Sequence, residues 1–321
     1  MNKIILLITF IFFINGCSLN KNSKFWTVEQ KITEENKKNY EKVLIEEEAL
    51  NKELNTKLTI KLDAKVNNNI LLRDFTNNDG RLDYNGILKK SSRYKFSKIK
   101  NFYQFEPAIS FNKKDIIFFD NKGSILKFND NSKLIWKKNY YSKSEKKLKP
   151  ILQFANNGKT LIAADSIAKY YALDLSNGEL IWSKNNLAPF NSQIKIYKNK
   201  FFIIDFSNTL RCFSLKDGKE LWNIKTENSL IRSQKKLSMV IVNDLLYFNN
   251  SIGDISAVDI NKGELFWQLP TQGNLIYEAA FSLETSDIIA DNNTLFFSNN
   301  KNQFFSIDLG TGSFNWENKV N

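Results

Sequence analysis

The chain has 321 residues, of which 42% are hydrophobic, and this is enough for one large domain with a sizeable core. It carries a net charge of +12, but no basic patch interleaved with aromatic residues indicates a nucleic-acid site. Histidine is absent, which excludes imidazole-based acid–base catalysis, Ser-His-Asp triads and His-ligated zinc. Two cysteines occur, Cys17 and Cys212, so no intrachain disulfide is expected if Cys17 is modified.

Residues 1–16, MNKIILLITFIFFING, contain one lysine, an unbroken apolar run and then a small residue, which is the pattern of a signal peptide. The apolar run is too short to span a membrane. The following segment, Ile14-Asn15-Gly16-Cys17, resembles the lipobox of bacterial lipoproteins. That resemblance implies that Cys17 is lipidated, with palmitate among its acyl chains, and begins the mature chain. Because Ser18 follows rather than Asp, it also implies anchoring in the inner leaflet of the outer membrane, on the periplasmic side. A plain secretory signal cleaved elsewhere is the alternative.

Residues 17–27 are the lipidated cysteine and a polar tether, and residues 28–100 are a charged, partly helical or irregular segment. Thr27 and Gln30 fit a capping box, and the leucines that follow have roughly helical spacing, which predicts a surface helix or a spacer over 27–55. Two later runs, 56–66 and 92–99, alternate as strands do. Either is a candidate to complete a sheet formed by the other end of the chain.

The segment Tyr171–Trp182, YALDLSNGELIW, returns in four other versions. They are ILKFNDNSKLIW ending at Trp136, RCFSLKDGKELW ending at Trp222, SAVDINKGELFW ending at Trp267 and FSIDLGTGSFNW ending at Trp316. The five tryptophans are separated by 46, 40, 45 and 49 residues. A period in this range, with several short strands per unit, predicts a β-propeller of four-stranded blades.

Each repeat ends in a turn and a strand that carries the tryptophan. A glycine four residues before Trp supplies the positive φ that the turn requires, and an aspartate four residues earlier accepts hydrogen bonds from the turn amides. The indole fills the contact between blades, where a small side chain six residues before the glycine also fits. We therefore interpret these residues as structural rather than catalytic. They are Trp136, Trp182, Trp222, Trp267, Trp316, Gly178, Gly218, Gly263, Gly312, Asp174, Asp259, Asp308, Ala172, Cys212, Ala257 and Ser306.

The pattern A-x-D-x-x-x-G-x-x-x-W resembles the blade repeat of pyrroloquinoline-quinone propellers over about residues 105–318. For the quinoprotein dehydrogenases that share this repeat, the resemblance implies an Asp base, a calcium ion held by Glu, Asn and Asp oxygens, and often a disulfide between adjacent cysteines. This sequence has no Cys-Cys pair and no acidic cluster in its blade connections. A quinoprotein enzyme is therefore the disfavoured alternative, and we expect no cofactor and no metal.

The fold class we expect is all-β, with five blades in residues 101–321, at about 105–138, 151–184, 193–225, 237–270 and 286–318. Propellers have about four to eight blades, and those with this repeat usually have about eight. We therefore expect that the sequence is the front part of a longer protein, with a five-bladed ring as the alternative. The densest basic run, Lys137–Lys149, lies in a connection between blades, and we interpret it as a solvated loop.

The succession of signal peptide, lipobox, polar spacer and propeller is similar to the layout of the BamB family, lipoproteins of the outer-membrane β-barrel assembly machinery. This resemblance implies a non-catalytic scaffold that binds the barrel-inserting subunit and assists the folding and insertion of outer-membrane proteins. It implies no nucleic-acid partner. A propeller that binds a polysaccharide or another cell-envelope ligand is a third hypothesis.

In the BamB family, a Leu-x-Leu-Arg segment after one blade tryptophan and an Asp-x-Asp segment after the next engage the barrel-inserting subunit. The residues Leu230, Ile231 and Arg232, after Trp222, are similar to the first segment. Glu284, after Trp267, is a weaker match to the second. The competing interpretation is that Leu230 and Ile231 begin the inner strand of the next blade and that Arg232 is only solvated.

Overall fold

The computed structural model describes residues 93–95, 97–99, 109–226, 236–271, 286–291, 293–299 and 302–319. The chain divides into two units, Met1–Asp63 and Ala64–Asn321, and every described residue belongs to the second unit. The predicted signal peptide, tether and helix over 27–55, and the alternating run 56–66, lie outside the described residues.

The described residues form five four-stranded sheets, which we call blades one to five in chain order. Blade one contains β1 (Ser110–Asn112), β2 (Asp115–Phe119), β3 (Ile125–Phe128) and β4 (Leu134–Lys138). Blade two contains β5 (Leu152–Asn156), β6 (Thr160–Asp165), β7 (Lys169–Asp174) and β8 (Leu180–Asn185). Blade three contains β9 (Lys195–Tyr197), β10 (Lys200–Ile204), β11 (Thr209–Ser214) and β12 (Glu220–Lys225).

Blade four contains β13 (Met239–Val242), β14 (Leu245–Asn249), β15 (Ile255–Asp259) and β16 (Leu265–Leu269). Blade five contains β17 (Ile289–Asp291), β18 (Thr294–Ser298), β19 (Gln303–Asp308) and β20 (Phe314–Lys319). A short helix, α5 (Lys143–Lys147), lies in the connection between blades one and two. The predicted fold class, an all-β propeller of four-stranded blades, is confirmed.

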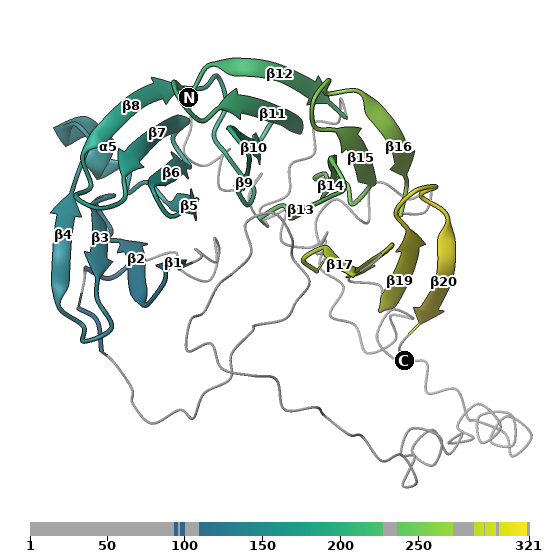
Figure 1. The fold of residues 1–321 in the computed structure, drawn as a ribbon, viewed down its shortest axis with the longest axis horizontal. Coiled ribbons are helices and arrows are strands. Elements are labelled where there is room, and N and C mark those ends of the chain that lie inside the picture. The colour runs from purple at the N-terminus through teal and green to yellow at the C-terminus, as the bar shows by residue number, and fades with distance from the viewer. Residues whose placement is uncertain are drawn as a thin grey trace, which may run out of the picture. The chain divides into compact units, whose positions relative to one another are not determined.

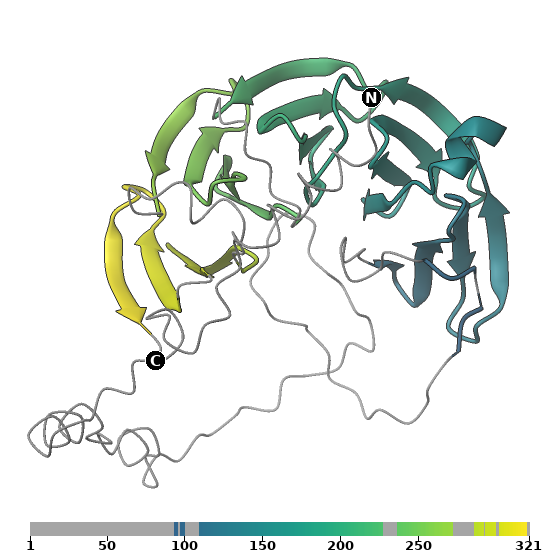
Figure 2. The ribbon, with the colours of Figure 1, turned by 180° about the vertical axis from the view of Figure 1, so that it is seen from behind.

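Every blade is an antiparallel meander in which strands pair in chain order. Figure 1 shows the first strands of the blades on the inside of an arc and the fourth strands β4, β8, β12, β16 and β20 on its outside. The same order is seen from behind in Figure 2, where α5 lies on the face toward the viewer. Meanders of this kind need only short turns, and the turns within a blade alternate between the two faces of the arc.

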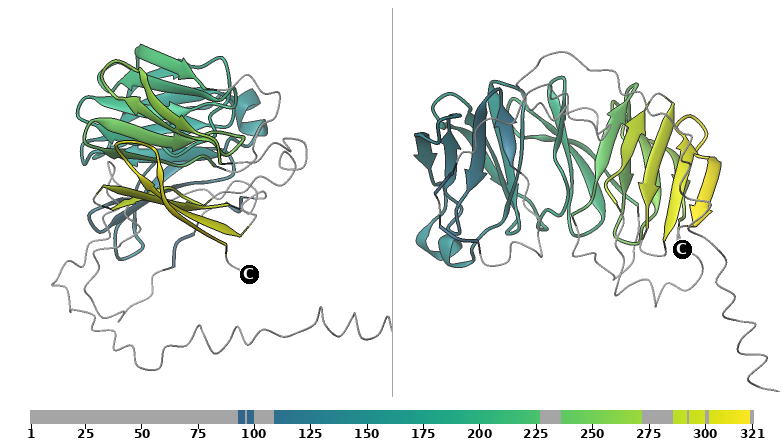
Figure 3. Two further views of the ribbon diagram at one scale, coloured as in Figure 1. Left: turned by 90° about the vertical axis from the view of Figure 1, so that its right-hand side faces the viewer. Right: turned by 90° about the horizontal axis from the view of Figure 1, so that it is seen from below.

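The second and third strands of each blade carry the core. Their apolar runs, such as IFF in β2 and FFII in β10, are buried on both sides, whereas the fourth strands contain one buried residue, Trp136, and are otherwise partly covered or exposed. The buried residues form four clusters, and each cluster joins two neighbouring blades. The edge-on views in Figure 3 show these sheets packed face to face. Packing between consecutive blades therefore makes up the core of the described part of the chain.

The described part of the run 92–99 is not in a strand. Ile99 is nevertheless buried in the cluster between blades one and two, and the ring of Tyr94 meets Phe128 edge to face at 5.4 Å between centroids. This part of the N-terminal segment therefore packs against blade one.

Candidate protein-interaction site

Four of the five repeated tryptophans reach forward onto the next blade. Each indole Nε1 donates a hydrogen bond to a backbone carbonyl of the following blade, directly after the third strand. The bonds join Trp136 to Leu175 (3.3 Å), Trp182 to Leu215 (3.1 Å), Trp222 to Ile260 (3.2 Å) and Trp267 to Leu309 (3.0 Å). Trp316, in blade five, is 39% exposed and contacts Phe296 and Phe304 of its own sheet.

The repeated glycines lie directly beneath these indoles. Gly263 has a φ of +75°, and a Cβ at this position would lie 2.6 Å from Cδ2 of Trp222. Gly178, Gly218 and Gly312 lie in the same way beneath Trp136, Trp182 and Trp267. The glycine is therefore required twice, once for its backbone conformation and once because any side chain would displace the ring.

The repeated aspartates order these turns. The carboxylate of Asp174 accepts the amide of Ser176, that of Asp259 accepts the amide of Asn261, and that of Asp308 accepts the amide of Thr311, each at 2.8 Å. A hydrogen bond from the Ser176 hydroxyl is the main reason that the pKa of Asp174 is lowered, and the Thr311 amide has the same effect on the pKa of Asp308. These carboxylates therefore have a structural role, as hydrogen-bond acceptors for the turn amides.

The small side chains lie opposite the tryptophans in the paired strands. Ala172, Cys212, Ala257 and Ser306 are the direct partners of Trp182, Trp222, Trp267 and Trp316 in the antiparallel register, and all four are buried. Burial raises the pKa of the Cys212 thiol to about 12, so the thiol is inert in the closed structure.

Blade one departs from the alignment read from the sequence. Its turn is one residue shorter, so that Lys127 lies opposite Trp136 and Asn129 takes the place of the turn aspartate. Ser132, with a φ of 61°, replaces the glycine. The Lys127 ammonium is buried, pairs with Asp115 at 3.1 Å, and donates to the Leu175 carbonyl of blade two at 3.2 Å. In blade one, an ion pair therefore takes the position that the other blades give to a small side chain.

A second periodic set was missed by the sequence analysis. An Asp or Asn is the last residue of the second strand of each blade or the residue directly after it, sixteen or seventeen residues before the tryptophan, and its Oδ1 accepts amides from the turn that follows. The set is Asp120, Asp165, Asp205, Asn250 and Asn299. The signal was present as a second recurring position with the same period as tryptophan. These turns lie on the same face of the arc as the connections between blades.

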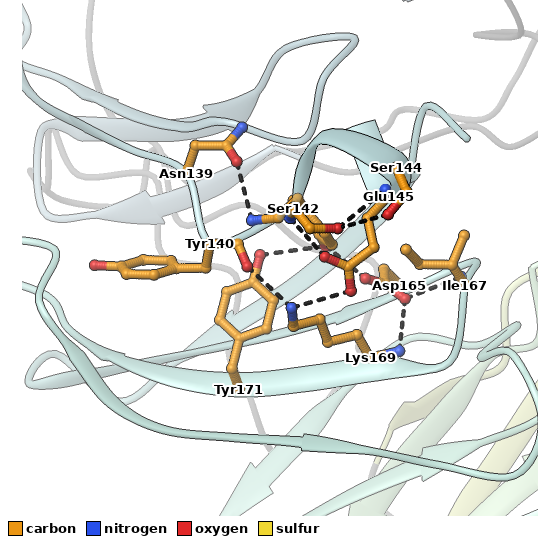
Figure 4. Close-up of polar contacts among 10 residues, drawn as sticks. Asn139, Tyr140, Ser142, Ser144, Glu145, Asp165, Ile167, Lys169 and Tyr171 are labelled. Atoms are coloured by element: carbon orange, nitrogen blue, oxygen red, sulfur yellow. Dashed lines mark hydrogen bonds and ion pairs between the residues drawn. The ribbon is translucent and has the colours of Figure 1, made fainter. Parts of the chain in front are cut away.

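The second carboxylate oxygen of Asp165 accepts a hydrogen bond within the polar network drawn in Figure 4. The hydroxyl of Tyr141, from the connection between blades one and two, donates to Asp165 Oδ2 at 2.5 Å, and the hydroxyl of Tyr171 donates to Tyr141 at 3.4 Å. Burial raises the pKa of Asp165 to about 6, although the Tyr141 hydrogen bond and Lys169 act in the opposite direction. Burial also raises the pKa of Tyr141 well above its usual value. This network attaches the connection firmly to blade two.

Helix α5 is the part of this connection that the sequence analysis interpreted as a solvated loop. Ser142 caps the helix: its hydroxyl accepts the amide of Glu145, and the Glu145 carboxylate accepts the amide of Ser142 at 2.6 Å. The spacing Ser-x-x-Glu could have predicted this capping box from the sequence. The run is solvated, but part of it is helical and fixed.

The predicted lipidation site Cys17 and the predicted partner residues Leu230, Ile231, Arg232 and Glu284 lie outside the described residues. The ends of their connections are described. The amide of Thr226, after β12, donates to the Asn208 carbonyl at 3.3 Å, and the Thr271 hydroxyl, after β16, donates to the Gly253 carbonyl at 2.7 Å. Both connections therefore start from fixed points on the face that also carries α5.

Membrane-spanning helices and metal-ligand clusters are both absent from the described ranges. Within these ranges, no helix has the length and hydropathy that crossing a bilayer demands. In the same part of the chain, no three His, Cys, Asp or Glu side chains are grouped as metal ligands would be.

Antiparallel blades linked by forward-directed indoles define a repeat β-propeller of the pyrroloquinoline-quinone type. A family model described as outer membrane protein assembly factor BamB matches residues 121–321, and the chain belongs to this family. A comparison with curated proteins gives no match.

Solved structures with a similar fold include BamB from Moraxella catarrhalis, with 15% identity and a TM-score of 0.50 over 66% of this chain and 63% of that protein. The computationally designed Ika8 protein has 12% identity and a TM-score of 0.52, over 66% of this chain and 61% of its own. Sqt1 from Saccharomyces cerevisiae has 12% identity and a TM-score of 0.52, over 65% and 60%. The matched region thus spans about three fifths of the length of each of these proteins, and the likeness establishes the fold alone.

Proposed function

We propose that this protein is a non-catalytic scaffold of the outer-membrane β-barrel assembly machinery, which binds the barrel-inserting subunit and assists the folding and insertion of outer-membrane proteins. The observation that carries the proposal is membership of the BamB family over residues 121–321. The propeller supplies what a scaffold needs, a rigid frame with connections of variable length on one face.

The commitment of the repeat residues to packing favours a scaffold over an enzyme. The indoles of Trp136, Trp182, Trp222 and Trp267 cover glycine turns of the next blade, and the repeated aspartates accept turn amides. These side chains are used by the fold and are not turned toward a common substrate position. A redox activity would need a different set of residues.

The partner surface we propose is on the connections after blades three and four. Leu230, Ile231 and Arg232 belong to the connection that begins after Thr226, and Glu284 belongs to the one that begins after Thr271. An arginine flanked by apolar residues is a common interface anchor, because guanidinium binds carboxylates bidentately while its neighbours exclude water.

The anchor we propose is Cys17, acylated after removal of residues 1–16, which attaches the protein to the periplasmic side of the outer membrane. Several acyl chains, at about 0.8 kcal/mol for each buried CH₂, make such attachment effectively permanent. The test is metabolic labelling with palmitate: wild-type protein should carry the label and a Cys17→Ser variant should not. Equal labelling of both would contradict the anchor.

The partner proposal is tested by co-purification. Arg232→Glu should leave the propeller folded, as judged by circular dichroism, and should reduce recovery of the barrel-inserting subunit. The matched control is Lys219→Glu, an exposed charge reversal in a turn on the opposite face. Equal recovery with both variants would remove the site assignment. Stoichiometric uptake of pyrroloquinoline quinone in the presence of calcium would instead support an enzyme.

A further inference from the structure

We propose that α5 and the start of the next blade connection form a docking surface for an acidic segment of a protein partner. We call this the α5 surface; it comprises Lys143, Lys146, Lys147, Leu148, Lys149 and Leu187. It goes beyond the proposed function and does not depend on it, since its residues precede the connection that carries Arg232.

Helix α5 is held rigidly against blade two, as the contacts drawn in Figure 4 indicate. Tyr141 is buried and bonds to Asp165, and the Tyr140 hydroxyl donates to the Gly178 carbonyl at 2.5 Å. Lys169, from β7, donates to the Tyr140 carbonyl at 2.9 Å and pairs with Glu145 at 3.2 Å. A five-residue helix has little stability alone, so these contacts fix an element that adds no buried residue to the core.

This rigid helix presents positive charge to the solvent. Lys143, Lys147 and Lys149 are exposed and Lys146 is partly exposed. Glu145 is the one acidic residue of the helix, and its carboxylate is used by the Ser142 amide and by Lys169. The positive charge of the surface is therefore not balanced within the helix, and it complements an acidic chain.

Two exposed leucines accompany these charges. Leu148, at the end of α5, is 65% exposed, and Leu187, in the connection between blades two and three, is 97% exposed. The turn of blade two that follows Asp165 lies between them: Lys169 contacts Glu145, and the Ala168 carbonyl accepts the amide of Asn186 at 2.7 Å. Both leucines therefore lie on connections that this turn contacts, on the face on which Figure 2 shows α5.

A protein segment fits this surface better than a lipid surface does. The aromatic residues of the two connections are turned inward: Tyr141 and Phe190 are buried, and the Tyr140 hydroxyl is bonded to Gly178. Interfacial membrane binding relies on a broad apolar face, commonly with exposed aromatic residues. Two separate leucines among fixed lysines suit an acidic segment with one or two apolar anchors.

The test is a binding measurement on the full chain. The probe is a short fluorescein-labelled peptide of alternating Glu and Leu, followed by fluorescence anisotropy. The variant carries Lys143→Glu, Lys146→Glu and Lys147→Glu. The matched control carries Lys216→Glu, Lys219→Glu and Lys262→Glu, three exposed reversals in turns after third strands, so both proteins change charge equally.

We expect the α5 variant to bind the peptide about tenfold or more weakly than wild type, the control to bind as wild type does, and added salt to weaken wild-type binding. A Leu148→Ser variant should also weaken binding, which bulk charge alone would not cause. Because Glu substitutions late in a helix oppose its dipole, a Lys143→Gln, Lys146→Gln, Lys147→Gln variant repeats the test with the fold undisturbed.

Equal weakening in the α5 variant and the control would overturn the proposal, because binding would then follow net charge. It would also be overturned if the α5 substitutions abolished binding to phosphatidylglycerol vesicles or to a single-stranded oligonucleotide and left peptide binding unchanged.

Discussion

Gly263 shows at the scale of one residue why the repeat requires glycine beneath the tryptophan. Positive φ is tolerated by Ser132 in blade one, where the turn is shorter. At Gly263, the Trp222 ring fills the place where a Cβ would stand. Backbone conformation and ring contact therefore act together, and they can be separated experimentally.

Gly263→Ala should lower the free energy of unfolding by about 2–5 kcal/mol, the sum of left-handed strain and of overpacking against the indole. Gly158→Ala is the matched control, since Gly158 has a φ of +85° but no atom lies within 4 Å of the place that a Cβ would take. That control should lose only about 1–2 kcal/mol. Urea unfolding measures both losses. Equal losses would show that the Trp222 ring can move away from the new Cβ without lowering the free energy of unfolding.

Asp165 predicts a specific pH dependence. Its pKa is raised to about 6 by burial, so the folded state holds a proton that the unfolded state, with a pKa near 3.8, has released. The contribution to stability is present in full below pH 3.8 and is lost as the pH rises to about 6, by on the order of 3 kcal/mol. Asp165→Asn has no such carboxyl, so the free energy of unfolding of wild type minus that of the variant should fall by this amount over the same range. Urea unfolding at several pH values measures the difference, and a constant difference between pH 4 and 6 would refute the assignment.

At the scale of the element, the turn after each second strand is organised by the Asp or Asn at or directly after the end of that strand, and blade three adds an arginine to it. Arg211, in β11, donates from Nε to Asp205 and from Nη1 to Glu220, both at 2.7 Å. The Asp205 side chain is fully buried, whereas Glu220 is 33% exposed. The guanidinium therefore ties the second turn of blade three to its outer strand.

Arg211→Met should destabilise the protein by about 3–5 kcal/mol, because it leaves the Asp205 carboxylate buried without its counter-ion. Glu220→Gln keeps the buried pair and loses only a partly solvated contact, so it should cost about 1 kcal/mol or less. Thermal unfolding of both variants tests the difference. Comparable losses would mean that the exposed pair is as important as the buried one.

The sequence predicted the turns and indole contacts of the repeat, in which the same residue type has the same role in successive blades. Glycine, aspartate and tryptophan recur at fixed spacing, because each turn and each indole contact repeats the same geometry. Blade one was misaligned by one residue, since Lys127 lies opposite Trp136 there and its ammonium donates to the Leu175 carbonyl of blade two, a contact that no local pattern reveals. The network around Tyr141 was missed for the same reason: its partners Asp165 and Lys169 belong to a different blade. The predicted partner residues stay predictions, because they lie outside the described residues.

At the scale of the whole molecule, each blade packs only on its neighbours, and stability should accordingly be divided among the interfaces. Cys212 is a probe of one of them. It is buried in the cluster between blades three and four, and with a pKa of about 12 it reacts only when that contact opens.

In a Cys17→Ser background Cys212 is the sole thiol, so its modification by a thiol reagent at pH 8 reports this opening. Trp222→Ala, at the same interface, should accelerate modification by roughly 100-fold, from a loss of about 3 kcal/mol. Trp136→Ala removes an equivalent ring between blades one and two and should have a much smaller effect. The same acceleration in both variants would indicate all-or-none opening.

The forward reach of four indoles gives each of blades two, three and four two unlike sides, one that offers a ring and one that receives it. Contacts of this head-to-tail kind extend by repetition and need no matching pair of identical patches. A tandem duplication of one blade in the gene would therefore insert a unit that can pack on both the preceding and the following blade. Propellers of this design can change their circumference by recombination, and the differing lengths of the connections leave the docking geometry untouched.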